Sequence, residues 1–452
     1  MPVVAGFLLG SCTTMGDYDY SAIDRSLESQ GYQAAYEQVV DDSRKMYSSH
    51  DEVLLHLDRG MLSHYAGEFE RSNQELAEAE RKIEEYYAKS VTQAISAYLV
   101  NDTVVDYSGE VFEDIYTNIF MALNYIQLGD VEGAFVEIRR FDNKLRAASA
   151  KYSDMISQAN KESGSNGGET VEVPDMEFHN SALARYLSMI LYRSRGQLDS
   201  ASIDMRYLNS AFASQPDIYN FPVPSSLAQE LEIPEGKARL NVLAFSGLAP
   251  VKEEEEERLF SISGDFYYKI AYPRMQSRDS AVKSIKVTVI PLQDESGQMM
   301  AATSRSVSME PLESISNIAL DTFAQHQALI YLRAMVRSIT KAVSTAVWGG
   351  LADNTSDVGL GLLFSVAQLA STVATEATER ADVRCTRFLP GFAWVTGVWL
   401  DPGSYRIVIE YKNSSGQVYH FLISSSAQTP FPSFQSEFRT SQKLHQGHCL
   451  LR

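Results

Sequence analysis

Few side chains of this sequence stand at spacings that could support chemistry. Two histidines and a cysteine lie close together at His445, His448 and Cys449, and imidazole and thiolate are ligands that zinc prefers. A closed zinc site needs a fourth ligand, which this cluster does not supply. The run Glu253–Glu257 offers consecutive carboxylates, but it lacks the alternation and the glycine of a calcium loop. We therefore expect no metal site, and we interpret the glutamate run as a solvated loop.

Catalytic motifs with a recognisable mechanism are missing from the sequence. It contains no glycine-rich phosphate loop, no Gly-x-Ser-x-Gly elbow and no His-Glu-x-x-His motif. His56 and His64 lie in a helical stretch, where surface or packing roles are the expected ones. We expect a protein without cofactors that is not an enzyme. A hydrolase with dispersed catalytic residues is the least favoured alternative.

Cys12 is the residue whose surroundings indicate a specific modification. A short apolar run ends in Gly10-Ser11-Cys12, and polar residues follow. This arrangement resembles the cleavage box of bacterial lipoprotein signals, in which the cysteine carries the lipid. The run is shorter than the about 20 residues that span a bilayer. Because the first basic residue is Arg25, residues 1–11 are interpreted as an incomplete signal segment. The alternative is a buried N-terminal segment with an ordinary core cysteine.

Length and charge limit the classes of partner. The chain has 452 residues, enough for two or three domains, and a net charge of -19. This charge argues against nucleic acid and against adhesion to anionic lipid through a basic patch. Membrane contact is therefore expected through the lipid at Cys12. Cys385 and Cys449 could form a disulfide in an oxidising envelope, or remain two thiols, and the sequence leaves both states open.

Residues 12–215 read as an array of helices. From Tyr20 to Phe212 the apolar residues have helical spacing, and three segments share a helix, a glycine turn and a second helix. The pattern resembles the tetratricopeptide repeat, with turn glycines at Gly67, Gly129 and Gly196. The usual period of this repeat is roughly 34 residues, and the spacing between these glycines is about twice that period. We therefore expect degenerate helical pairs, or a helix plus a loop, in 84–114 and 143–178, with a flexible loop near 163–170.

Residues 216–452 read as a mixed or antiparallel β domain with an inserted helical hairpin. β-branched and aromatic residues become frequent, and a turn at Asn413–Gly416 predicts a β-hairpin. Helices are expected near 313–347 and 360–380, and charged residues such as Lys341 and Glu376 favour a soluble hairpin over a membrane-inserting one. The fold class is therefore α+β. Strands are predicted at 239–245, 260–271, 285–290, 404–411 and 418–423.

As a whole, the sequence resembles a family of poorly characterised bacterial envelope lipoproteins with a tetratricopeptide-like N-terminal half and a β-containing C-terminal half. The resemblance implies a location and an architecture, and it carries no catalytic residue. It rests on Asp58-Arg59-Gly60, Leu128-Gly129-Asp130, Gly247–Lys252, Lys269–Pro273, Ala381–Arg384, Leu389-Pro390 and Leu400–Tyr405.

Together these features predict a lipid-anchored protein of the bacterial cell envelope, on the periplasmic or surface face of the outer membrane. Stacked helix pairs present a concave surface that commonly binds a peptide or a protein. We expect a scaffold or regulator of an envelope assembly that binds a protein or peptide partner. The alternative is a surface lipoprotein that binds a glycan or nutrient, which an exposed platform among the 24 tyrosines would favour.

Overall fold

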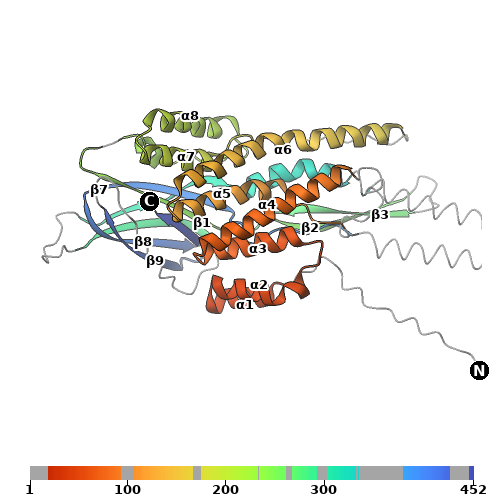
Figure 1. Cartoon of the computed structure of the whole chain (residues 1–452), viewed down its shortest axis with the longest axis horizontal. Coiled ribbons are helices and arrows are strands. Elements are labelled where there is room, and N and C mark those ends of the chain that lie inside the picture. The colour runs from red at the N-terminus through yellow and green to blue at the C-terminus, as the bar shows by residue number, and fades with distance from the viewer. Residues whose placement is uncertain are drawn as a thin grey trace, which may run out of the picture.

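The fold is α+β, with a helical N-terminal half and antiparallel sheets in the C-terminal half, as predicted (Figure 1). The structure is a computed structural model that describes residues 19–92, 105–165, 175–232, 234–260, 267–292, 303–331, 334, 380–427 and 447–451. Among the helices of these residues, none has the length and apolar character that crossing a membrane requires.

The helices of the N-terminal half pair as hairpins. The pairs are α1 (Ser21–Gln30) with α2 (Tyr32–Met46), α3 (Glu52–Tyr65) with α4 (Phe69–Thr92), α5 (Val111–Gln127) with α6 (Val131–Ser165), and α7 (Ala182–Ser194) with α8 (Leu198–Ser214). Gly67, Gly129 and Gly196 lie in the turns of the last three pairs with φ of 80°, 78° and 72°. Glycine adopts this left-handed conformation without the strain of a Cβ atom, so these turns can be short.

Long second helices account for much of the spacing between the turn glycines. Of the two alternatives expected for 84–114 and 143–178, the described residues fit a helix plus a loop, because α4 continues to Thr92 and α6 to Ser165. The predicted start of the loop near 163–170 is wrong, since Ser163–Ser165 still belong to α6. The rest of that stretch lies outside the described residues.

The strands form two four-stranded sheets and a two-stranded ribbon. Sheet A has the order β10-β1-β7-β6, sheet C has the order β5-β4-β8-β9, and β2 pairs with β3 alone among the described residues. The strands are β1 (Ala238–Ser246), β2 (Val251–Phe260), β3 (Tyr267–Gln276), β4 (Val282–Pro291), β5 (Arg305–Ser308), β6 (Glu310–Ser314), β7 (Phe392–Leu400), β8 (Gly403–Asn413), β9 (Val418–Ala427) and β10 (Gly447–Leu451). The predicted hairpin at Asn413–Gly416 joins β8 to β9.

Sheet A lies between the helices and sheet C, which makes three layers. The side chains of β1 alternate between the two faces of sheet A. Leu243 and Phe245 belong to the core shared with the helices. Val242 and Ala244, which point to the other face, belong to the core between the two sheets. The predicted boundary at residues 215/216 therefore separates two regions of sequence that share one hydrophobic core. A short 3-10 helix, η3 (Ser225–Gln229), connects the helices to β1.

The helices predicted in the C-terminal half are described in part. A helix spans 315–331, so the helix expected at 313–347 starts two residues later, after β6 has ended at Ser314. The helix expected at 360–380 lies outside the described residues, except for residue 380, which is not helical. Residues 381–391, named here the docked segment, follow without regular secondary structure and lead into β7.

Candidate functional site

The docked segment runs along α3, and alternate residues of the segment contact it. Arg384, Thr386 and Phe388 contact Asp51, Asp58 and Tyr65, which follow one another at intervals of seven residues. Seven helical residues are two turns, or about 10.5 Å, so these three α3 side chains lie on one face. Residues 384–388 have no regular secondary structure and run beside that face, from its first to its last position. The helical hairpins thus hold a segment of their own chain as a peptide-binding surface would.

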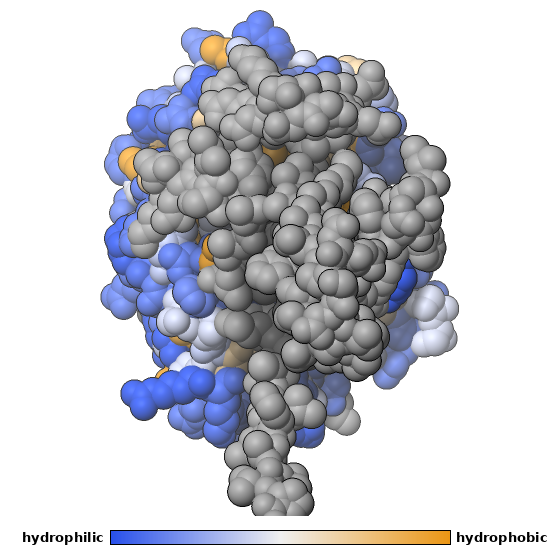
Figure 2. Space-filling model, turned by 90° about the vertical axis from the view of Figure 1, so that its right-hand side faces the viewer, coloured by the Kyte–Doolittle hydropathy of each residue, from blue (hydrophilic) through white to orange (hydrophobic). Residues whose placement is uncertain are grey.

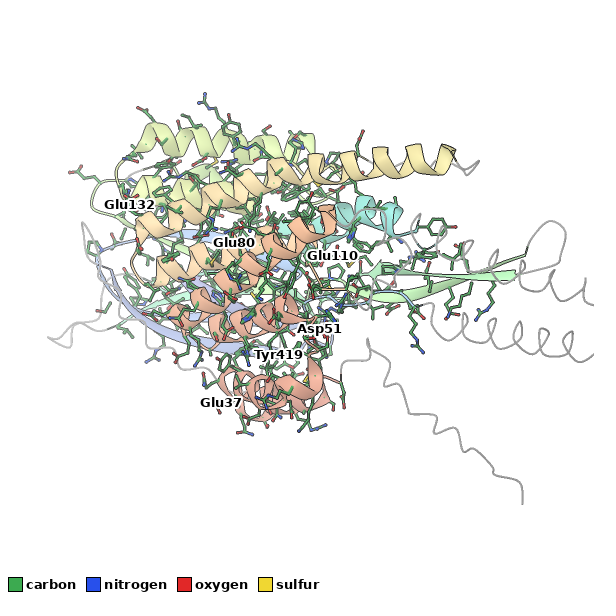
Figure 3. The ribbon with its side chains drawn as sticks, turned by 45° about the vertical axis from the view of Figure 1, so that its right-hand side comes forward. Glu37, Asp51, Glu80, Glu110, Glu132 and Tyr419 are labelled. Atoms are coloured by element: carbon green, nitrogen blue, oxygen red, sulfur yellow. The ribbon has the colours of Figure 1, made fainter. Side chains whose placement is uncertain are left out.

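Arg384 makes the first of these contacts, at the start of α3. Its Nη1 lies 3.1 Å from Asp51 Oδ1 and 3.0 Å from the Val105 carbonyl oxygen, and both charged side chains are 5% exposed. Its Nε and Nη2 each donate to Asp382 at 2.8 Å. Burial alone would raise the pKa of Asp382, but the Arg384 charge lowers it overall. Asp51 lies in the interior between the helices and the β2–β3 ribbon (Figure 3).

Thr386 contacts two buried carboxylates from different helices. Its Oγ1 donates to Asp58 Oδ1 at 3.0 Å, and its backbone N–H donates to Glu113 Oε1 at 2.5 Å. Burial raises the pKa of Asp58 to about 6. Burial and the nearby charge of Glu110 raise the pKa of Glu113 to about 7. A single residue of the docked segment therefore ties α3 to α5 through groups that titrate near neutral pH.

The end of the docked segment is held by α1 and by the end of α3. Arg387 forms an ion pair with Asp24 at 2.7 Å. The Phe388 ring packs edge-on against Tyr20, with ring centroids 6.2 Å apart, and its carbonyl oxygen accepts from Tyr65 Oη at 2.9 Å. Arg384, Thr386, Arg387 and Phe388 thus each have a polar contact with α1, α5 or α3 and its N-cap residue Asp51.

A buried ion cluster lies beside the docked segment at the start of α5. Glu110, the N-cap residue of α5, lies 2.7 Å from Lys252 Nζ of β2 and 2.8 Å from His326 Nδ1 of the helix over 315–331. Burial alone would raise the pKa of Glu110, but Lys252 and His326 hold it well below its usual range. Figure 3 shows Glu110 where the helices approach the β2–β3 ribbon. Glu110 therefore joins the two halves of the chain.

Glu313 of β6 makes a second connection between the halves. Its carboxylate is fully buried and accepts from the hydroxyls of Tyr116 at 2.5 Å and Tyr219 at 2.8 Å. Ser181 Oγ and the Leu183 N–H, at the start of α7, donate to the same carboxylate. An anion at a helix N-terminus meets the unpaired N–H groups and the positive end of the helix dipole. These contacts explain how a buried carboxylate is tolerated between α5 and α7.

The residues singled out from the sequence lie at separate places. Cys12 and His445 lie outside the described residues. Cys385 is a free, buried cysteine. Cys449 and His448 lie in β10, opposite Ala244 and Phe245 of β1. Across the part of the chain that the structure describes, no group of three or more potential ligands could hold a metal ion.

The glutamate run and the two helical histidines have structural roles. The interpretation of Glu253–Glu257 as a loop is wrong, because these residues lie in β2. Glu255 pairs with Arg274 and Glu256 pairs with Lys269, both at 2.6 Å across the ribbon. Cross-strand ion pairs of this kind let an acidic strand form. Of the histidines, His64 is buried with its Nδ1 2.6 Å from Asn124, and His56 lies 2.6 Å from Glu75.

The contacts of the docked segment were not predicted from the sequence, although two signals were present. Asp51, Asp58 and Tyr65 are spaced by seven residues, which places polar groups on one face of a helix. The segments Asp58-Arg59-Gly60 and Ala381–Arg384 also belong to the motifs on which the family resemblance rests. That Asp58 contacts Thr386, two residues after the second of these motifs, could be seen only in the folded chain. No known protein family matches this chain, and neither a curated protein nor a solved structure is significantly similar to it.

Proposed function

We propose that this protein is a lipid-anchored scaffold of the bacterial cell envelope that binds a protein partner through its helical hairpins. Cys12 is the proposed lipid site, nine residues before α1 begins at Ser21. The helical hairpins resemble tetratricopeptide repeats in their glycine turns and in their alternation of first and second helices. The observation that carries the proposal is the exposed acidic surface of the second helices α2 and α4, with carboxylates such as Glu37 and Glu70.

The inner face of the array is already occupied by the chain itself. Nearly all residues of α5 are buried, and α7 is buried along most of its length. Sheet A and the docked segment cover these first helices. The concave surface, expected from the sequence to receive the partner, therefore holds the C-terminal half in place. A partner must use the outer surface, which the second helices provide.

The outer surface of α2 and α4 indicates the kind of partner. Exposed carboxylates lie along both helices, at Glu37 and Asp41 in α2 and at Glu70 and Glu84 in α4. Figure 3 shows Glu37 at the outer surface, and the described residues visible in Figure 2 are mostly hydrophilic. With a net charge of -19, the protein attracts positively charged surfaces at long range. We infer a partner protein with a basic face.

The alternative functions receive less support from the packing. A glycan platform needs exposed aromatic rings, yet most described tyrosines are buried or partly buried, and Tyr207 at 54% is the most exposed of the large hydrophobic side chains. A hydrolase needs carboxylates that can reach a substrate. The buried carboxylates Asp58, Glu110, Glu113 and Glu313 instead accept hydrogen bonds from groups of the chain.

The proposal is tested by photocrosslinking in native membranes. A photoreactive residue at Glu37 or Glu70 should capture the same protein, while one at Lys286, exposed on β4 in sheet C, should not. Cys12→Ser should release the chain from the membrane fraction and abolish the crosslink. Membrane association that survives Cys12→Ser would refute the anchor. Capture of the same mixture of abundant proteins from all three positions would refute the binding surface.

A further inference from the structure

Negative charge is concentrated in the first half of the helical array. Residues 21–92, which form the first two hairpins, carry 15 acidic and 8 basic side chains. The last two hairpins, over 111–165 and 182–214, carry ten of each. The array is therefore acidic on the side of α2 and α4 and balanced on the side of α6 and α8. A basic surface can thus exist on α6 although the whole chain has a net charge of -19.

Two arginines on the outer face of α6 have no counter-charge. Arg139 and Arg146 are exposed, and because they are seven residues apart they lie two turns from each other on one face. Within the residues that the structure describes, neither forms an ion pair, whereas Arg140 between them pairs with Glu80 of α4. Val136, which is 48% exposed, lies on the same face one turn before Arg139. This face is therefore apolar at Val136 and positively charged from Arg139 to Arg146.

The helices α4 and α6 lie side by side, so their residues can be compared by height along the array. Glu80 of α4 forms ion pairs with Arg140 and Lys144 of α6. Counted from the turn glycines Gly67 and Gly129, Glu80 is at position 13 and its two partners are at positions 11 and 15. Both helices run in the same direction, because each is the second helix of its hairpin (Figure 1). Residues at equal positions therefore lie at about the same height.

Glu84 of α4 and Arg146 of α6 are opposite charges at the same height. Each is seventeen residues after its turn glycine, and both side chains are exposed. No ion pair joins them within one chain, and Glu84 has no other ion-pair partner among the described residues. Two such groups on neighbouring helices are self-complementary, because a second copy that is turned over presents them in exchanged places.

We propose that the basic partner of the acidic surface is a second copy of this chain, which presents its α6 to α4. This inference rests on the proposed function, since it names the partner of that surface. A twofold axis that runs between α4 and α6, parallel to both, places α4 of each copy over α6 of the other. Because this rotation preserves height, Glu84 of each copy meets Arg146 of the other, and Gln74 meets Val136.

The same arrangement brings both chains to one membrane. Tyr20, just before α1, and Tyr47, just after α2, both donate to Asp58, so α1 begins where α2 ends. Since successive helices alternate in direction, this is also the end at which α4 and α6 finish (Figure 1). Rotation about an axis parallel to the helices keeps this end on the same side in both copies. Each chain thus enters α1 from the same end of the dimer, as two anchors at Cys12 in one membrane require.

The first test is photocrosslinking between two differently tagged copies of the full chain in native membranes, where anchoring provides a high effective concentration. A photoreactive residue at Ala77, exposed on α4, should capture the other copy, while one at Lys283, exposed on β4, should not. Capture of a different protein from Ala77, without the second copy, would overturn this inference and leave the proposed function intact. No capture from Ala77, Glu37 or Glu70 would refute both.

The second test reverses the charges. Arg146→Glu or Glu84→Arg alone places like charges opposite each other in both symmetric contacts, and the yield of the crosslink from Ala77 should fall about tenfold. One copy with Arg146→Glu and another with Glu84→Arg restore opposite charges in both contacts, so their mixture should regain the yield. The control Lys283→Glu changes the net charge as Arg146→Glu does and should leave the yield unchanged. A mixture that crosslinks as poorly as either variant alone would overturn the pairing.

Discussion

Replacing Arg384 with alanine removes a buried cation from the docked segment. The guanidinium is buried, and it supplies the charge that balances Asp51 and Asp382. In the variant, the Asp51 carboxylate remains 5% exposed within the fold and loses its cation. The carbonyl oxygens of His50 and Val105 lose a donor as well. The folded state should therefore be destabilised, while the unfolded chain is little affected.

The expected magnitude follows from the burial of this ion pair. Breaking a buried pair by removing one partner destabilises a protein by about 3–5 kcal/mol, because a buried charge is left without compensation. The matched control is Arg274→Ala, whose pair with Glu255 has side-chain exposures of 62% and 37%. An exposed pair contributes about 0–1 kcal/mol. Both substitutions remove an arginine from an ion pair, at 3.1 Å and 2.6 Å, but Arg384 is buried and also has Asp382 and two carbonyl oxygens as partners.

Urea unfolding monitored by circular dichroism measures how much each variant lowers the free energy of unfolding. With a slope of about 3 kcal/mol per molar urea, Arg384→Ala should lower the midpoint by about 1 M or more, and Arg274→Ala by at most about 0.3 M. Hydrogen exchange should also show faster exchange at the Thr386 amide in Arg384→Ala, because the docked segment loses its first contact with α3. Equal midpoints for the two variants would refute the view that the segment is held by buried charge.

Two further predictions concern the other buried carboxylates. The pKa of Glu113 is raised to about 7, so the folded state holds a proton there that the unfolded chain has lost above about pH 4.5. The contribution of this group to the free energy of unfolding is therefore fully present below pH 4.5 and decreases by about 3 kcal/mol as the pH rises to 7. In Glu113→Gln, the free energy of unfolding measured in urea should depend less on pH in this range. For Glu313, Glu313→Leu leaves several buried donors unpaired and should lower the unfolding free energy by about 3 kcal/mol, whereas Tyr219→Phe should lower it by about 1 kcal/mol. Equal losses for the two would contradict the role of Glu313 as a shared acceptor.

Local sequence patterns predicted the helical half well because a helical hairpin is specified by residues close together in the chain. Apolar residues at helical spacing and a glycine with positive φ are enough to define a hairpin such as α5–α6. The same reasoning left two alternatives open for the intervals between hairpins. An amphipathic pattern does not show whether a second helix ends early or continues, as α6 does to Ser165, because its end depends on what it packs against.

The strands that were missed or misread depend on neighbours distant in sequence. The run Phe392–Leu400 lacks the regular alternation of polar residues because the helices cover one face of β7 and sheet C covers the other. The run Glu253–Glu257 was interpreted as a loop because consecutive carboxylates repel one another. In the folded chain, Lys269 and Arg274 of β3 lie beside these carboxylates and make the strand stable.

The sequence by itself determined the α+β class, the glycine turns of the hairpins, the β8–β9 hairpin and the acidic character of the protein. These features follow from composition and from interactions between residues close in the chain. Only the tertiary structure decided that the inner face of the array is filled by the protein itself. The contacts that fill it join residues such as Asp58 and Thr386, which are 328 positions apart. No local propensity encodes such a pair, because its energy arises only when burial has removed water from both groups.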